Sequence, residues 1–268
     1  MVRPGFLVAL VAALAAAGFS LAFTAASRAR VLRSGAVARA SRPAAPRPNA
    51  PARGRAKPHK AGRHAGSPPV QVLRVRRGRA VTLRDRPDGR AIASLGDRTD
   101  FGSPMTLSVV RRRGRWASVP ATALGNGRLG WVDTADTALD RRTTHVRLVI
   151  RLSDRRLELR IRGRLRRSVP VAIGRPANPT PRGRFSVTDK MLGSGFGPYY
   201  GCCILALSGH QPNTPPGWTG GDRLAIHGTN AQSSIGTASS AGCLRAFDGD
   251  LRVLMRRVPL GTPVVIRG

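Results

Sequence analysis

The chain has 268 residues, with 46 Lys and Arg against 13 Asp and Glu and a formal net charge of +33. Its length allows one large or two small domains with buried cores, and its charge indicates an anionic partner. With 3 Trp, 2 Tyr and 7 Phe, and with basic residues spread along the whole chain, the sequence offers few platforms for stacking bases. We therefore expect no nucleic-acid partner.

Residues 1–26 predict a signal peptide or an N-terminal membrane anchor. After Arg3, the run from Pro4 to Ser27 carries no charge and has about the length that a membrane-spanning helix needs. The small residues at its end are also typical of a cleavage site, so both alternatives stay open. The arginines that follow oppose export, because positive charge tends to remain in the cytoplasm. We still favour export, for the chemical reasons given below.

Residues 27–69 predict a disordered linker. The segment is dense in Arg, Pro and Ala and contains no acidic and no aromatic residue. Such a composition buries too little apolar surface to offset the entropy of ordering the chain. If the N-terminal segment is not cleaved, this linker tethers the rest of the chain to a membrane.

Residues 70–140 predict a small β domain. Short β-prone runs alternate with turn signals, as in the segments VQVLRV, AVTLRD, MTLSVV, WASVP and LGWVD. The order of these runs resembles bacterial SH3-like domains, in which a tryptophan follows a turn and a GWV segment closes the barrel. The resemblance makes Trp116 and Trp131 core or groove residues. The region lacks a cluster of His, Cys and acidic residues, so we expect it to bind a ligand or to act as a spacer rather than to catalyse a reaction.

Residues 143–268 predict a second β-rich unit. The segment from residue 145 to 174 alternates strand patterns with an SD turn and a GR turn, as in a β-meander. Leu251, Leu254, Met255 and Val258 recur at helical spacing and predict a short helix. The last residues, PVVIRG, predict a buried strand. Neither a dinucleotide-binding glycine motif nor a P-loop is present, so nucleotide-dependent chemistry and a cofactor are not expected.

Two of the three cysteines are adjacent, and the third lies in a different setting. Cys202 and Cys203 belong to a hydrophobic, strand-like run, where a disulfide between neighbours would be strained, so we expect them to be small core residues. Cys243 follows a glycine in a loop of small residues before the predicted helix. A thiol at a helix start has a lowered pKa and is more nucleophilic, and a histidine within reach would activate it.

Two competing site types fit the sequence less well. The cysteines and histidines lack the short spacings that are typical of zinc sites, so we expect no metal. Serines abound near Cys243, but the GxSxG motif of serine hydrolases is missing.

Residues 226–245 read IHGTNAQSSIGTASSAGCLR and resemble the signature of the L,D-transpeptidase catalytic-domain family, which is YkuD-like. That signature has a His-Gly-Thr on a strand, an SIG segment, and a terminal Ser-x-Gly-Cys-x-Arg. The upstream segment NPTPRGRFSV resembles the family's TPxGxF segment, so the likeness covers about residues 145–268. Ala241 departs from the pattern, because many members carry a second histidine there.

The resemblance implies a mainly β chain, with a β-sandwich-like catalytic domain that has one or two short helices. It implies that Cys243 is the nucleophile and His227 the general base in peptidoglycan cross-linking, with stem peptides as donor and acceptor. Backbone N–H groups at Gly242 and Cys243 are the expected oxyanion donors. Water as the acceptor would make the protein an L,D-carboxypeptidase.

The resemblance also indicates residues that bind the substrate or shape its pocket. Arg245 is expected either to bind a substrate carboxylate or to brace the loop. Ser240 is expected to orient the loop, and Gly228 and Thr229 to shape the pocket wall. The remaining candidates come from a Pro/Gly-rich region of residues 195–221 that is either a lid or a surface loop with packed aromatics: Tyr199 and Tyr200, His210 and Trp218.

The sequence thus predicts an extracytoplasmic bacterial enzyme of the cell wall or of the outer face of the cytoplasmic membrane, because peptidoglycan lies outside that membrane. A non-enzymatic alternative is a wall-binding protein with a degenerate site, which the residue at position 241 and the basic linker suggest. Anionic wall polymers are a second candidate partner. A DNA-binding role through residues 27–69 would predict an affinity that falls steeply with salt.

Overall fold

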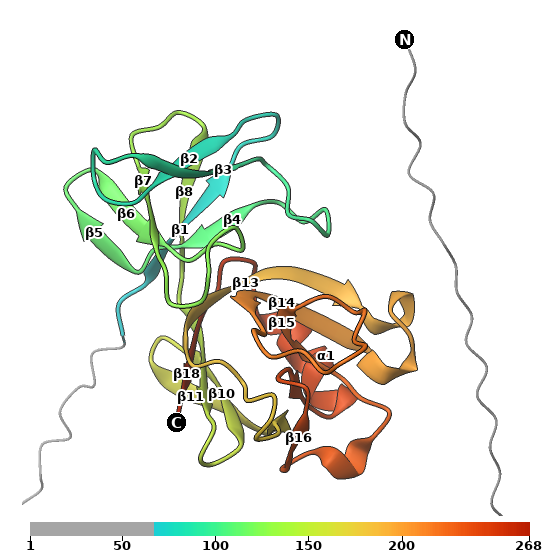
Figure 1. The fold of residues 1–268 in the computed structure, drawn as a ribbon. Coiled ribbons are helices and arrows are strands. Elements are labelled where there is room, and N and C mark those ends of the chain that lie inside the picture. Colours follow the sequence, from blue (N-terminus) through green and yellow to red (C-terminus); the bar gives the residue numbers. More distant parts are fainter. Residues whose placement is uncertain (1–66) are drawn as a thin grey trace, which may run out of the picture. The chain divides into compact units, whose positions relative to one another are not determined.

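The computed structural model describes residues 67–268. The predicted leader or anchor and nearly all of the predicted linker, up to residue 66, lie outside the described residues. Within residues 67–268 the chain is built mainly of strands, with one α-helix and three short 3₁₀ helices (Figure 1). This confirms the predicted mainly β class. Among these residues, no helix combines the length and the apolar character that crossing a membrane requires.

The strands of residues 70–144 form two sheets. In the first, β1 (Val70–Val75) lies between β4 (Thr106–Ser108) and β8 (Leu139–Thr144). The order of the second is β3 (Ala91–Leu95), β2 (Val81–Arg84), β7 (Gly130–Asp133), β6 (Trp116–Val119) and β5 (Arg111–Arg113). Trp116 is buried, whereas the three arginines of β5 are exposed. The SH3-like identity of this unit stays a prediction.

The C-terminal residues form an eight-stranded sheet. Its order is β11 (Arg164–Pro170), β10 (Arg156–Ile161), β9 (Val146–Arg151), β18 (Pro263–Arg267), β13 (Gly183–Leu192), β14 (Cys203–His210), β15 (Arg223–His227) and β17 (Leu244–Arg245). The first three strands pair antiparallel in sequence order, which confirms the predicted meander. A separate parallel pair joins β12 (Ile173–Gly174) to β16 (Ala238–Ser240). The 3₁₀ helices are η1 (Gly193–Gly195), η2 (Pro198–Tyr200) and η3 (Gln232–Ser234).

The alternation of apolar residues decides which face of the meander is buried. Leu148 and Ile150 of β9 lie beside Leu159 and Leu157 of β10, and all four side chains are buried. Successive side chains of a strand point to opposite faces, so every second residue enters the same core. The residues between these positions, Val149 and Glu158, are only partly buried.

Helix α1 (Asp248–Arg257) packs against β14 of the sheet. Leu251 and Leu254 are buried at the predicted helical spacing, and Val258 is buried at the end of the helix. Acidic residues in the first turn and basic residues in the last turn complement the helix dipole. The predicted helix is therefore confirmed.

Polar contacts connect the N-terminal β unit to the C-terminal sheet. The carboxylate of Asp189 in β13 is fully buried and accepts a hydrogen bond from the hydroxyl of Thr99. Arg223, at the start of β15, places Nη2 2.6 Å from Oδ2 of Asp100. These contacts join the loop around Asp100 to β13 and to β15, the strand that carries His227.

Candidate active site

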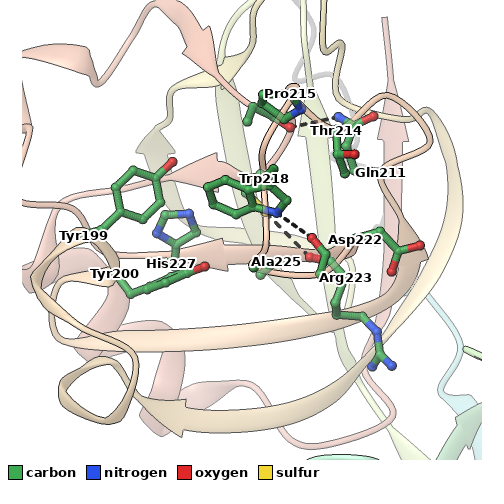
Figure 2. Close-up of a pocket in the computed structure, with 14 residues that line it drawn as sticks. Tyr199, Tyr200, Gln211, Thr214, Pro215, Trp218, Asp222, Arg223, Ala225 and His227 are labelled. Atoms are coloured by element: carbon green, nitrogen blue, oxygen red, sulfur yellow. Dashed lines mark hydrogen bonds between the residues drawn. The ribbon is translucent and has the colours of Figure 1, made fainter. Parts of the chain in front are cut away.

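One pocket of the C-terminal unit contains both His227 and Cys243 (Figure 2). His227 ends β15, and Cys243 immediately precedes β17, which pairs with β15 in parallel. The sheet thus brings together two residues that are sixteen positions apart in sequence. The side chains and backbone around them come from Tyr199, Tyr200, Gln211, Thr214, Pro215, Trp218, Gly220, Gly221, Asp222, Arg223, Ala225 and Ala241.

The imidazole of His227 is buried, with 1% of the residue exposed. Its Nδ1 lies 2.6 Å from the carbonyl oxygen of Gly228. Because a carbonyl can only accept a hydrogen bond, Nδ1 carries the proton and Nε2 has a free lone pair in the neutral ring. Among residues 67–268, Nε2 has no hydrogen-bond partner. Burial lowers the pKa of His227 to about 4, so the ring is neutral at pH 7.

Aromatic rings surround this histidine. The ring centroids of Tyr200 and Tyr199 lie 4.9 Å and 5.6 Å from that of His227, and Trp218 lies 6.4 Å from Tyr199 (Figure 2). Burial also raises the pKa of the Tyr200 hydroxyl. The rings exclude water from the imidazole, which is the physical cause of its lowered pKa.

Cys243 differs from the expectation of a thiol at a helix start. Helix α1 begins at Asp248, and the two residues after Cys243 form β17 instead. Burial raises the pKa of the Cys243 thiol, and its Sγ lies 3.8 Å from the carbonyl oxygen of Arg223. The predicted lowering of the pKa by a helix dipole is therefore wrong. Buried surroundings favour the neutral thiol, because an ion loses more solvation than a neutral group.

The loop before Cys243 is fixed by hydrogen bonds. The hydroxyl of Ser240 accepts a bond from Gly242 N–H at 3.0 Å and donates one to the Cys243 carbonyl at 2.6 Å. Ser240 thus lies where a residue that orients the loop is expected. Its bond engages the N–H of Gly242, which leaves the N–H of Cys243 as the remaining oxyanion donor of the predicted pair.

Arg245 lies beside the pocket rather than in solvent. Its Nη2 donates a hydrogen bond to the hydroxyl of Tyr199, and its guanidinium carbon lies 4.8 Å from the centre of the same ring. Its Nε is buried without a partner among the described residues. The side chain therefore holds Tyr199 over His227 and keeps one unused donor.

Gly228 and Thr229 form the turn after His227. A Cβ atom on Gly228 would lie 2.2 Å from Oδ1 of Asp248, so the close approach of these segments requires glycine. Thr229 is buried, and its hydroxyl accepts the N–H of Ala231 at 3.0 Å. Both residues shape the backbone next to His227, and neither lines the pocket.

His210 lies outside the pocket. Its Nδ1 is 3.0 Å from Oδ1 of Asp222, and its Nε2 is 2.8 Å from the carbonyl oxygen of Thr122 in the N-terminal unit. Both ring nitrogens are therefore engaged at the contact between the two units. The structure does not bring His210 together with Cys243.

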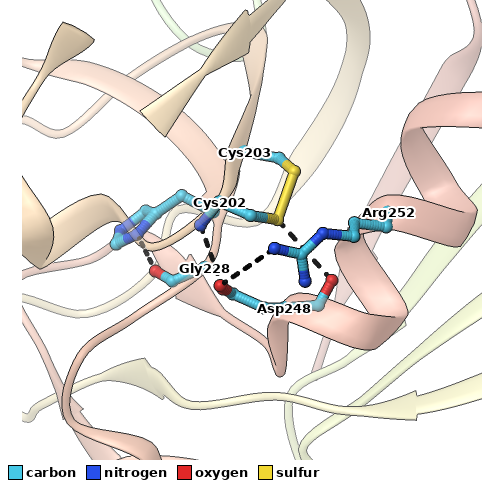
Figure 3. The surroundings of a disulfide bond; sticks show 6 residues. Cys202, Cys203, Gly228, Asp248 and Arg252 are labelled. Carbon is cyan, nitrogen blue, oxygen red and sulfur yellow. Dashed lines mark hydrogen bonds and ion pairs between the residues drawn. A yellow bond between two sulfur atoms is a disulfide. The ribbon is translucent and has the colours of Figure 1, made fainter. Parts of the chain in front are cut away.

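Cys202 and Cys203 form a disulfide with each other (Figure 3). The expectation of two free core thiols is wrong, because only Cys203 belongs to β14, while Cys202 lies in the turn before it, where the side chains need not alternate. The N–H of Cys202 donates to Oδ1 of Asp248 at 3.1 Å, and the carbonyl of Cys203 accepts the N–H of Gly228 at 3.0 Å. The disulfide therefore lies behind the turn that follows His227.

Sequence reasoning missed two buried residues that contact the Cys243 loop. Gln211 is 5% exposed and donates to the carbonyl of Ala241, and Thr180 is 4% exposed and donates to the carbonyl of Gly242. Thr180 lies in the TPRG segment, which was a signal of its place near the site. Gln211 lies in a Pro/Gly-rich loop, and no spacing distinguishes it there.

Within residues 67–268, no three His, Cys, Asp or Glu side chains are grouped so as to hold a metal ion.

Comparison with known proteins identifies relatives of the C-terminal unit. Residues 145–266 match the family model of the YkuD L,D-transpeptidase catalytic domain. The chain is 37% identical over 126 residues to an L,D-transpeptidase named YkuD from Bacillus licheniformis, a match that covers 46% of this chain and 67% of that protein. It is 32% identical over 121 residues to YkuD of Bacillus subtilis, covering 44% and 64%. The chain thus spans about two thirds of the length of these relatives.

Solved structures of L,D-transpeptidases match this chain with low TM-scores. L,D-transpeptidase 3 from Mycobacterium tuberculosis, in complex with a faropenem-derived adduct, has a TM-score of 0.38 and 17% identity, covering 52% of this chain and 73% of that one. The C442S mutant of the Enterococcus faecium L,D-transpeptidase has a TM-score of 0.38 and 17% identity, covering 60% and 74%.

The match to the family model, over residues 145–266, includes both His227 and Cys243. The identity of 37% over two thirds of a relative decides the assignment. The chain belongs to the YkuD-like family of L,D-transpeptidase catalytic domains.

Proposed function

We propose that the protein is a peptidoglycan L,D-transpeptidase that forms 3→3 cross-links through a thioester on Cys243, with His227 as the general base. The observation that carries the proposal is the pairing, in one pocket, of a thiol and a neutral imidazole whose Nε2 has no partner among the described residues. A neutral base and a neutral thiol suit proton transfer at the moment of attack.

Acylation begins when the thiol turns from the Arg223 carbonyl toward Nε2 of His227. Nε2 takes the thiol proton while Sγ attacks the carbonyl carbon of the third stem residue. The C–N bond to the terminal D-alanine then breaks, and the proton on Nε2 passes to the leaving amine. The Cys243 N–H stabilises the oxyanion, because the N–H of Gly242 is engaged by Ser240.

Deacylation uses a second stem peptide. The side-chain amine of its third residue attacks the thioester, loses a proton to Nε2 and forms the new amide. The C–S bond breaks, and the proton returns to sulfur. Water in place of the amine gives hydrolysis, which is the L,D-carboxypeptidase alternative. Tyr199, which lines the pocket, is proposed to contact the donor peptide, and Arg245 is proposed to hold Tyr199 in place through its hydrogen bond.

Peptidoglycan stem peptides are thus the proposed donor and acceptor, and the proposed location is extracytoplasmic. Anionic wall polymers are the proposed second partner, because exposed arginines such as those of β5 give the surface a strong positive charge. The N-terminal β unit is proposed to be an SH3-like domain that either binds a ligand or serves as a spacer for the catalytic unit.

The test is incubation of the purified full chain with disaccharide-tetrapeptide, followed by mass spectrometry. We expect an acyl adduct on Cys243 with loss of D-alanine, and a cross-linked dimer. The Cys243→Ala variant is expected to give neither product, while Ser239→Ala, at an exposed neighbouring position, is expected to give both.

Other outcomes separate the alternatives. Tripeptide without dimer would indicate a carboxypeptidase. Neither adduct nor product from folded protein would contradict an enzyme. If that inactive protein still bound isolated cell walls, the result would favour a wall-binding protein with a degenerate site. Ala241 is the residue that suggests this alternative.

A further inference from the structure

The two peptide groups before Cys243 have two N–H and two carbonyl groups, and hydrogen bonds within the protein engage three of these four. The Ala241–Gly242 peptide accepts a bond at its carbonyl from Nε2 of Gln211, at 3.1 Å, and donates its N–H to Ser240 at 3.0 Å. The carbonyl of the next peptide, which joins Gly242 to Cys243, accepts a bond from Oγ1 of Thr180 at 2.8 Å. The N–H at the other end of that peptide is the one proposed to stabilise the oxyanion.

Gln211 connects the Cys243 loop to a second segment. Its Nε2 lies 3.1 Å from the carbonyl of Pro179 and 3.3 Å from that of Asn178, in addition to Ala241. Its Oε1 accepts the N–H of Asn213 at 3.1 Å. A buried amide with all its groups engaged holds one orientation, since any rotation would leave a polar atom unpaired.

The amide of Gln211 also packs directly on Gly242. A Cβ atom at position 242 would lie 1.7 Å from Nε2 of Gln211, and the φ angle of +114° is one that L residues rarely adopt. The lack of a side chain at Gly242 therefore allows the Gln211 amide to approach, and this packing restricts the position of the Gly242 backbone.

Thr180 directly follows Pro179, in the segment that Gln211 contacts. Its hydroxyl accepts the N–H of Gly174 at 2.8 Å while it donates to the carbonyl of Gly242. Both functions of the hydroxyl are used inside the protein. The direction of its donated bond is therefore set by β12, to which Gly174 belongs.

Because a peptide group is planar, fixing the Gly242 carbonyl also fixes the direction of the Cys243 N–H at the opposite edge of that plane. We propose that Thr180 and Gln211 are positioning residues for acyl transfer, which aim the Cys243 N–H at the developing oxyanion before the substrate arrives. This inference rests on the proposed role of Cys243. A donor that is already oriented stabilises the transition state without reorganisation.

The test compares two reactions of Cys243 in the full chain. Acylation by a carbapenem passes through a tetrahedral oxyanion, whereas alkylation by iodoacetamide displaces iodide at a CH₂ carbon and forms no oxyanion. We expect Thr180→Val and Gln211→Met each to lower the acylation rate at saturating carbapenem by roughly tenfold or more. Their alkylation rates and half-saturating carbapenem concentrations should stay within about twofold of wild type.

Two variants serve as controls. Thr180→Ser retains the hydroxyl and is expected to restore acylation. Thr262→Val removes a hydroxyl that is equally buried and donates to the carbonyl of Pro259 at 2.7 Å, away from the pocket. It should match Thr180→Val in stability and wild type in acylation. If Thr180→Val does not fold, Gln211→Met carries the comparison by itself.

Three results would overturn the inference. The first is a wild-type acylation rate in folded Thr180→Val and Gln211→Met. The second is an equal fall in acylation and alkylation, which would mean that the thiol itself is displaced. In both cases the proposed function stands, because wild type is acylated. The third is absence of a carbapenem adduct and of a tetrapeptide adduct in wild type, which removes the proposed function and the inference together.

Discussion

The sulfur of Cys243 lies 3.8 Å from the backbone carbonyl oxygen of Arg223, across the pocket that it shares with His227. A carbonyl accepts a hydrogen bond from a thiol but repels a thiolate. Burial favours the protonated form and outweighs the backbone of Ala225 and the charge of Arg245, which lower the pKa of the thiol. The resting pocket therefore holds a neutral thiol and a neutral imidazole.

The pH dependence of alkylation tests this state. Because burial raises the pKa of the Cys243 thiol, its reaction with iodoacetamide should titrate with an apparent pKa above the value of about 8.5 for a free cysteine. The rate is measured by mass spectrometry from pH 6 to 10, with glutathione as the reference thiol. An apparent pKa below 8 would instead indicate a thiolate stabilised by His227.

The pKa of His227 predicts how stability depends on pH. The unfolded chain protonates this histidine near pH 6.5, but the folded protein does so only near pH 4. Between these values the unfolded state binds more protons, so the free energy of unfolding falls as the pH falls. We expect His227 to account for a loss of about 2–3 kcal/mol from pH 7 to 4.5. Urea unfolding of wild type and His227→Gln at both pH values measures it; an equal loss in both proteins would contradict it.

Tyr199→Phe is expected to destabilise the protein by about 1–3 kcal/mol, because Arg245 loses the acceptor of its Nη2 bond in a buried place. The matched control is Tyr200→Phe, whose hydroxyl is not bonded to Arg245. Thermal unfolding of the two variants provides the comparison. Equal effects would show that the hydrogen bond to Arg245 contributes little.

Asp189→Ala should cost about 3–5 kcal/mol of stability. It removes a fully buried carboxylate that accepts a bond from Thr99 and lies 4.0 Å from Arg223, and it leaves part of a buried guanidinium without a counter-charge. Asp140→Ala, which breaks an exposed pair with Arg76, should cost less than about 1 kcal/mol. Urea unfolding distinguishes the two, and a small effect of Asp189→Ala would argue against the buried contact.

Thiol counting tests the disulfide. Denatured, unreduced protein should take up one iodoacetamide label, on Cys243, because Cys202 and Cys203 are joined. After reduction it should take up three labels. Three labels without reduction would contradict the disulfide.

The sequence by itself determined the strand and helix pattern of the C-terminal unit, because periods of two and of about 3.6 residues depend on neighbours in the chain. The meander of β9 to β11 and helix α1 follow from that pattern. The motif that contains His227 and Cys243 also identified the family, since the residue types and their spacing are visible without a structure.

Tertiary structure decided the electrostatics and the support of the site. The pKa of Cys243 depends on burial, which raises it, and on the backbone of Ala225 and the charge of Arg245, which lower it; the local sequence does not encode this balance. Gln211 and Thr180 reach the Cys243 loop from segments about thirty and sixty positions away. Such contacts form when the sheet closes, so a single sequence read along its length does not reveal them.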